Sequence, residues 1–190
     1  MKIALISGSG RKDSLNTQLA RLAEKDLAGK AQVFLLDYSD LPMFSQDLEF
    51  PAPKAVVQVR DALRDADGLW FFCPEYNGNI TPLLLNLVDW LSRPENPQDG
   101  YFNCMLRNKA YTISGIGGRG GTARAQKRLE EMLNFLGMHG YTEKDVMLKM
   151  SPEVMMSSSL SSLPEAAGEI ENQAAGFLAF LQTTDKEGQH

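Results

Sequence analysis

Short apolar runs alternate with longer amphipathic stretches along the chain. Continuous apolar runs that end at a glycine, a proline or a polar residue predict strands buried on both faces. The predicted strands are 2–7, 32–36, 68–73, 109–114 and a fifth that includes 146–148. Between these runs, apolar residues recur at intervals of three and four, which predicts helices. The predicted helices are 15–27, 53–66, 82–91, 123–136 and 165–181.

The alternation of strand and helix indicates the fold class. Such a chain builds a parallel sheet, because each crossover helix returns it to the same edge of the sheet. We therefore predict an α/β fold with a doubly wound, five-stranded parallel sheet and helices on both faces. The 190 residues suit one domain, placed at 1–182, with 183–190 as a disordered tail. Stretches 41–50 and 92–103 are predicted loops, and the Ser- and Met-rich stretch 155–163 has no assigned structure.

Ligands of such sheets bind outside the carboxyl ends of the strands, where the strand order switches. That rule selects the loops after the first, third and fourth strands. The first loop, 8–16, combines glycine, serine and asparagine with one arginine, Arg11, at the start of a helix. Backbone N–H groups, hydroxyls, a guanidinium and the positive end of a helix are the donors that bind a phosphate. The loop therefore predicts a phosphate site, in which Ser14 also suits the helix N-cap.

The other two loops suit a flat heterocycle. Residues 74–79 follow the most apolar strand, and their amides can bond the edge of a planar ring with Tyr76 beside it. Without a ligand, the same segment is an ordinary Asn-Gly turn. Residues 114–121 contain GxGxxG, but the position about 20 residues further on lies near Phe135, at a helix end and not at a strand end as a dinucleotide site requires. We interpret these glycines as allowing the backbone to approach a flat ring closely.

Four motifs in order resemble those of the NADPH-dependent FMN reductase family, a flavodoxin-like group that includes quinone, chromate and azo-dye reductases. The likeness covers residues 2–136. The motifs are Gly8-Ser9-x-Arg11-x-x-Ser14-x-Asn16, Pro74-Glu75-Tyr76-Asn77-Gly78, Asn86-x-x-Asp89-Trp90-Leu91-Ser92-Arg93-Pro94 and Gly121-Thr122-Ala123-Arg124-Ala125-Gln126.

The resemblance implies a flavodoxin-like fold and an FMN-dependent oxidoreductase. Such an enzyme transfers electrons from NADPH or NADH to a small acceptor such as a quinone, a free flavin, an azo compound or a metal oxyanion. The implied phosphate ligands are Ser9, Arg11, Ser14 and Asn16. The implied neighbours of the flavin ring are Pro74, Glu75, Tyr76, Asn77 and Gly78, with Ser114, Gly117 and Gly118 on its other side. The resemblance also implies a homodimer or homotetramer, for which loops 41–50 and 92–103 are the candidate contacts.

The implied flavin, the two cysteines, the charge and the hydropathy exclude several kinds of site and partner. A bound flavin carries the chemistry itself, so no catalytic side chain is expected. Cys73 ends an apolar strand, which suits packing, and it shares no metal-binding spacing with Cys104, so we expect no metal site and a reducing, cytoplasmic location. The net charge of −5, with no block of like charge, argues against a nucleic-acid partner. No apolar stretch is long enough to span a bilayer, so we expect no membrane partner.

Two other functional classes stay open on the sequence. A flavodoxin-type electron carrier would bind FMN but would deliver electrons only through a partner protein. Its phosphate loop is usually rich in Ser and Thr without an Arg, so Arg11 and the segment 74–78 favour the reductase. The other alternative is a non-enzymatic flavin-binding protein. Oxidation of NADPH by the pure protein separates the reductase from both alternatives.

Overall fold

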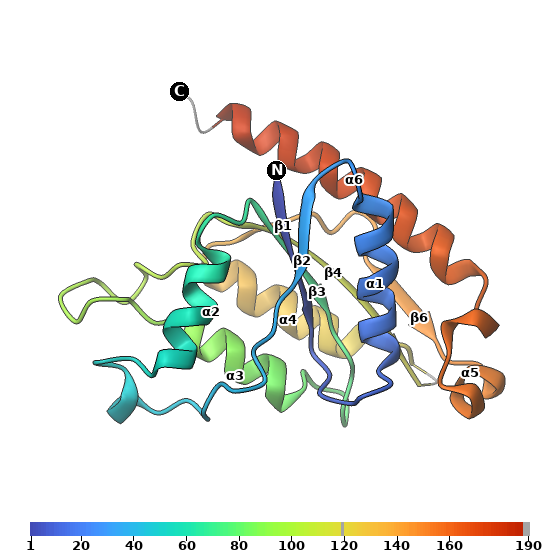
Figure 1. Ribbon diagram of the computed structural model, residues 1–190, viewed down its shortest axis with the longest axis horizontal. Helices are drawn as coiled ribbons and strands as arrows, with labels where there is room; N and C mark the ends of the chain where they lie inside the picture. The colour runs from blue at the N-terminus through green and yellow to red at the C-terminus, as the bar shows by residue number, and fades with distance from the viewer. Residues whose placement is uncertain (119, 188–190) are drawn as a thin grey trace.

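The computed structural model describes residues 1–118 and 120–187, in which six strands form one parallel sheet (Figure 1). The strands are β1 (Lys2–Ser7), β2 (Gln32–Leu35), β3 (Gly68–Phe72), β4 (Ala110–Gly117), β5 (His139–Gly140) and β6 (Val146–Lys149). Their order is β2-β1-β3-β4-β5, with β6 also paired to β4. The order reverses at β1, because β2 lies on one side of it and β3 on the other. The doubly wound parallel sheet predicted from the sequence is therefore confirmed.

Helices cover both faces of this sheet, as predicted. They are α1 (Leu15–Leu27), α2 (Lys54–Arg64), α3 (Pro82–Leu91), α4 (Ala123–Phe135), α5 (Pro152–Ser157) and α6 (Glu165–Glu187), with short 3-10 turns η1 (Gln46–Leu48) and η2 (Leu160–Ser162). α1 and α6 pack on one face with α5 and η2, and α2, α3 and α4 pack on the other. None of the helices in the described residues combines the length and apolar character needed to cross a membrane.

The sheet divides the core into two layers, and this division explains why β3 is apolar at every position. Leu69 and Phe71 face the α2–α4 layer, whereas Trp70 and Phe72 face the α1–α6 layer. All four side chains are fully buried. Alternate side chains of a strand point to opposite faces, so a strand covered on both sides needs apolar residues at every position.

Two elements differ from the sequence-based expectation. β4 continues to Gly117, whereas the strand was expected to end at Ser114 and to give way to a glycine loop at 115–121. The extra residues pair with β6, so the fifth strand position consists of two short segments, β5 and β6, beside successive parts of β4. Glycine at position 115 is required there, because a Cβ would collide with the Cys73 carbonyl oxygen and the Thr122 hydroxyl.

The C-terminal part of the chain is also more regular than predicted. The Ser- and Met-rich stretch contains the second half of α5 and all of η2, and α6 continues to Glu187. Residues 183–187 are therefore helical, where a tail was expected, and the rest of that expected tail, 188–190, lies outside the described residues. Gln173 of α6 fixes the helix on the sheet by donating to the Thr112 hydroxyl at 2.8 Å and to the Ile113 carbonyl at 2.7 Å. A fully buried amide needs such partners, so this bonding specifies where α6 lies.

Candidate functional site

A pocket of about 130 Å³ lies where the loops after β1, β3 and β4 meet. These strands are neighbours in the sheet and run parallel, so their carboxyl ends converge on one edge, at the bottom of Figure 1. The pocket is lined by Ser9, Arg11, Ser14, Leu15, Asn16, Pro74, Glu75, Tyr76, Ile116, Gly117, Gly118 and Met150. The three loops selected from the sequence therefore form one site.

The first loop presents hydroxyls and a guanidinium at the start of α1. Ser14 is the N-cap, and its Oγ accepts from the Thr17 backbone N–H at 3.2 Å. Ser9 Oγ accepts from the backbone N–H of Arg11 at 3.3 Å. Both hydroxyls act as acceptors in these bonds, so their protons stay available to a ligand. No acidic residue lies in the first turn of α1, so the positive end of the helix is not neutralised there.

Glycine at position 8 lets the first two loops touch. Its backbone N–H donates to the Phe72 carbonyl at 2.9 Å, and its carbonyl accepts from the Thr81 hydroxyl at 2.6 Å. A Cβ at this position would lie 2.8 Å from Cδ of Pro74, closer than real side chains approach. The absence of a side chain at Gly8 therefore sets the spacing of the first loop and the second loop.

Asn16 connects the first loop to the third. Its Nδ2 donates to the Ile116 carbonyl at 3.0 Å, and its Oδ1 accepts from the Ile116 N–H at 3.1 Å. The side chain is buried, and both of its hydrogen bonds go to the backbone of Ile116 in β4. Asn16 thus orients the third loop, a task that the family resemblance did not imply for it.

The second loop is a tight hairpin. Tyr76 and Asn79 exchange two backbone hydrogen bonds of 3.0 Å each. Asn77 and Gly78 between them both have positive φ, of 54° and 71°. This is the type I′ geometry that Asn-Gly favours. It leaves Tyr76 52% exposed at the edge of the pocket.

Glu75 links the second loop to α4. Its Oε2 accepts from the backbone N–H groups of Arg124 and Ala125, at 3.0 and 3.1 Å. Within the described residues, the N-cap residue Thr122 makes no side-chain capping bond to the helix. A carboxylate is favourable at a helix N-terminus, because it meets unpaired N–H groups and the positive end of the dipole. Glu75 therefore caps α4 from a loop about fifty positions away.

The third loop supplies backbone to the pocket. The Gly117 carbonyl accepts from the Met150 N–H at 2.8 Å, which brings the residue after β6 into the lining. A Cβ at Gly117 would collide with the Gly121 carbonyl, whereas Gly118 faces open space. Arg119, which the sequence also places in this loop, lies outside the described residues.

Ser114 is not brought to the pocket. Its side chain is fully buried, and its Oγ accepts from Trp70 Nε1 at 2.8 Å and donates to Gln173. The physical reason is that β4 continues beyond Ser114, so this residue lies inside the sheet and its hydroxyl faces the α6 layer. The Ser114 side chain therefore does not line the pocket, and its expected place beside a ring stays a prediction.

The pocket unites most of the residues expected from the sequence. It omits Asn77 and Gly78 as well as Ser114, because the tip of the hairpin lies beyond the lining. Sequence reasoning missed Leu15, Ile116 and Met150. Leu15 and Ile116 lie inside the selected motifs as apolar neighbours of polar residues. Met150 directly follows the fifth strand position, whose carboxyl end lies at the same sheet edge, so topology was the signal that could have found it.

Cys73, at the end of the strand that leads into the second loop, is not an activated nucleophile. Burial, and then the nearby Glu75 carboxylate, raise the pKa of the Cys73 thiol to about 12. The thiol is therefore protonated at neutral pH and acts as an apolar packing group. Among residues 1–118 and 120–187, no three His, Cys, Asp or Glu side chains are grouped as a metal ion would require.

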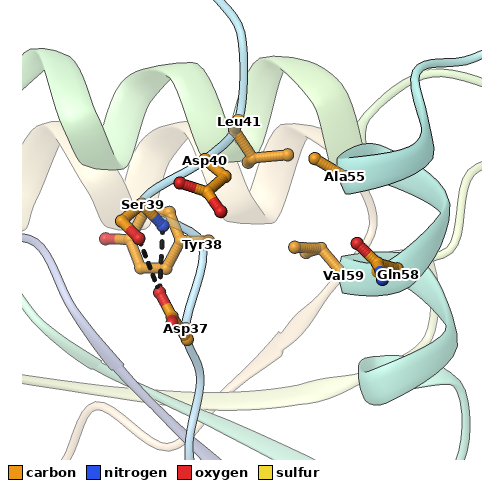
Figure 2. A pocket seen from close by; sticks show the side chains of 8 residues that line it. All are labelled: Asp37, Tyr38, Ser39, Asp40, Leu41, Ala55, Gln58 and Val59. Atoms are coloured by element: carbon orange, nitrogen blue, oxygen red, sulfur yellow. Dashed lines mark hydrogen bonds between the residues drawn. The ribbon is translucent and has the colours of Figure 1, made fainter.

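A second hollow of about 250 Å³ lies between the end of β2 and α2 (Figure 2). It is larger than the pocket described above, but its chemistry differs. Asp37 and Asp40 contribute carboxylates, and no Lys or Arg is in the lining. Hydrogen bonds from the Ser39 N–H and hydroxyl hold the pKa of Asp37 below its usual value, so the carboxylate stays charged. A phosphate would be repelled here, so the chemistry of the donors, and not the volume, favours the pocket at the strand ends as the candidate site.

Comparison with known proteins agrees with this geometry. The model of the NADPH-dependent FMN reductase family matches residues 1–153. The chain is 34% identical over 172 residues to an NAD(P)H-dependent FMN reductase of Pseudomonas aeruginosa, covering 90% of this chain and 84% of that protein. It is 32% identical over 171 residues to a 2-hydroxy-1,4-benzoquinone reductase of a Burkholderia species, covering 90% and 85%.

A solved structure supports the same assignment. FerB of Paracoccus denitrificans, a flavoenzyme NAD(P)H:(acceptor) oxidoreductase, superposes with a TM-score of 0.80 at 26% identity, covering 96% of this chain and 98% of FerB. The family match spans all three loops of the pocket. The chain is thus a flavin-dependent oxidoreductase that belongs to the NADPH-dependent FMN reductase family.

Proposed function

We propose that the pocket binds FMN with its phosphate at the first loop and its ring between the second and third loops. The protein then transfers electrons from NADPH or NADH to a small acceptor such as a quinone, a free flavin, an azo compound or a metal oxyanion. The observation that carries the proposal is the donor set of Ser9, Arg11 and Ser14 at the N-terminus of α1. Two free hydroxyl protons, a guanidinium and an uncompensated helix end suit a dianionic phosphate.

The ring would lie against backbone and few side chains. On one side it meets Pro74, Glu75 and Tyr76, and on the other Gly117 and Gly118. Asn77 and Gly78 would act by shaping the hairpin that carries Tyr76. Ser114 would act through the position of β4, since its side chain is in the core.

A bound flavin supplies the hydride and electron chemistry, and the protein supplies binding and orientation. In that division of work, Glu75 and Asn16 hold the second and third loops in place, because their polar atoms bond backbone groups of neighbouring elements. Each loop is thus fixed to another before any ligand arrives. Such preorganisation lowers the ordering cost of binding.

We further propose that the protein is a homodimer or homotetramer. The pocket of about 130 Å³ is smaller than the roughly 300–1,000 Å³ of small-molecule sites, so one copy covers only part of a flavin. The exposed apolar side chains of loops 41–50 and 92–103 offer a surface for a second copy. They are Met43, Leu48, Phe50, Tyr101 and Phe102.

These two loops are joined into one surface. Arg93 Nε lies 2.7 Å from Glu49 Oε1 in a mostly buried ion pair, and the Arg93 guanidinium stacks 4.8 Å from the centre of the Tyr101 ring. Phe102→Glu would place a charge in this surface, and we expect light scattering to show a smaller species. Met156→Glu, at an exposed site outside the two loops, should leave the mass unchanged. A wild-type monomer that retains full activity would refute the oligomer.

The decisive experiment on function measures flavin binding and turnover by the purified protein. FMN should bind more tightly than FAD, because the site offers one phosphate position, and NADPH or NADH should be oxidised when a quinone is added. Equal affinity for FAD would contradict the phosphate assignment. FMN binding without oxidation of either nicotinamide would favour the electron carrier. The two cysteines are unpaired, which suits a reducing compartment, and we propose the cytoplasm.

A further inference from the structure

The segment that follows β6 reaches back to the phosphate loop. Arg11 Nη2 donates a 2.8 Å hydrogen bond to the hydroxyl of Ser158, which lies 147 positions further along the chain. Within the described residues, the Arg11 guanidinium has no other hydrogen-bond or ion-pair partner. One edge of the guanidinium is therefore held by the protein, while Nε and Nη1 stay available to a ligand.

The backbone of Ser158 is in an unusual conformation. Its φ of 50° and ψ of 34° lie in the left-handed region, and it ends α5 by donating its N–H to the Val154 carbonyl at 2.9 Å. The other non-glycine residues with positive φ in the described chain are Asn77 and Asn108. Asparagine tolerates this region well, but serine is seldom found there. Such strain persists where the surroundings fix the residue, and it is a reason to look for a function.

Hydrogen bonds and apolar packing both fix the position of Ser158 relative to α1. Gln18 of α1 donates from Nε2 to the Ser158 carbonyl at 2.8 Å and accepts at Oε1 from the Leu160 N–H at 3.1 Å. Val154 and Leu160, which flank Ser158, are buried in the core layer that contains α1. The hydroxyl of Ser158 thus has a set position beside the helix end that forms the phosphate site.

The partner of Arg11 is a neutral hydroxyl and not a carboxylate. A carboxylate in the place of Ser158 would neutralise Arg11 and compete with a phosphate for it. A hydroxyl accepts a hydrogen bond from the guanidinium without cancelling its charge. The contact therefore orders the long arginine side chain and leaves its full charge for an anion.

We propose that Ser158 is a positioning residue for phosphate recognition, which holds Arg11 over the first loop so that its free N–H groups meet the phosphate of FMN. This inference rests on the proposed function, since it names a further residue of the same site. Without Ser158, Arg11 would have to be ordered during binding. The FMN dissociation constant should then rise about two- to tenfold, the factor for immobilising one long side chain.

The test compares FMN with riboflavin, which has the same ring and no phosphate. Ser158→Gly removes the hydroxyl but suits the left-handed backbone, so the fold is expected to persist. Fluorescence titration should show weaker FMN binding and unchanged riboflavin binding for this variant. Arg11→Ala combined with Ser158→Gly should bind FMN no more weakly than Arg11→Ala alone, because the two residues act as one unit. Ser161→Ala is the matched control and should bind both ligands normally, because the Ser161 hydroxyl pairs with the neighbouring Ser159 hydroxyl.

Several outcomes would overturn the inference. FMN affinity unchanged in Ser158→Gly would show that the hydroxyl plays no part in phosphate recognition. Equal weakening of FMN and riboflavin would assign Ser158 a purely structural role. A further loss on adding Ser158→Gly to Arg11→Ala would show that it does not act through Arg11. Failure of the wild-type protein to bind FMN would instead refute the proposed function itself.

Discussion

The capping of α4 by Glu75 makes a quantitative prediction, because a single carboxylate joins the second loop to a helix. Glu75→Ala removes two hydrogen bonds of 3.0 and 3.1 Å to backbone N–H groups of Arg124 and Ala125. Loss of a side-chain cap costs about 0.5–2 kcal/mol, and the upper half of that range applies where no second cap takes over. Thr122, the residue at the N-cap position, has no capping bond of its own among the described residues. We therefore expect a loss of about 1–2 kcal/mol.

That loss can be measured by urea unfolding and by thermal unfolding, both followed by circular dichroism. For a chain of this size, 1 kcal/mol shifts the melting temperature by about 2–4 °C, so Glu75→Ala should melt about 2–8 °C lower. Glu75→Gln keeps the shape and one acceptor oxygen but loses the charge opposite the helix dipole. Its melting temperature should therefore lie between those of wild type and Glu75→Ala. Glu131→Ala, at an exposed position on the same helix, is the matched control. Wild-type stability in Glu75→Ala would refute the capping role.

Four other changes test separate parts of the argument. Arg11→Ala should weaken FMN binding by about 1.5–3 kcal/mol, the scale of a hydrogen bond to a charged group, as measured by flavin fluorescence. Gly115→Ala should destabilise the protein by about 1–3 kcal/mol in urea, because the added methyl meets backbone that must shift. Gln173→Leu should cost a similar amount, about 1–3 kcal/mol, because it leaves buried polar groups of β4 unpaired. Burial, and then the Glu130 carboxylate, raise the pKa of Asp145 to about 7. The protonated form favours folding, so the stability it contributes is complete below the ordinary pKa and is lost as pH rises through 7. Asp145→Asn should therefore be more stable than wild type at pH 8 and lose this advantage by pH 4.

The three loops of the pocket are connected by contacts that each cross between elements. Gly8 packs against Pro74, Asn16 bonds Ile116, and Glu75 caps α4. Each contact joins segments that are far apart in the sequence. A change at any one of them is therefore expected to affect the affinity for flavin and the stability of the fold together, whereas Arg11→Ala should affect affinity alone.

The sequence alone determined the order of elements and the edge at which the site lies. Runs such as 68–73 are apolar at every position, which requires cover on both faces and hence a parallel sheet. The donor pattern of Ser9, Arg11 and Ser14 before a helix is the basis for the proposed anion site, and it can be read locally because the motif and its helix are contiguous. The Asn-Gly hairpin was equally local, since its two residues themselves prefer positive φ. These features arise between residues that are close in the sequence, so the sequence pattern alone predicts them.

Only the tertiary structure decided which polar side chains face the pocket. Ser114 was expected beside a ring, but pairing of β6 with the end of β4 extends the strand past it, and its hydroxyl faces Trp70 and Gln173 instead. The partners of Glu75 are amides about fifty positions away, and the partner of Arg11 is Ser158, 147 positions away. No periodicity encodes such pairs, because they form when strands and helices from distant parts of the chain pack and bring their ends to one edge of the sheet.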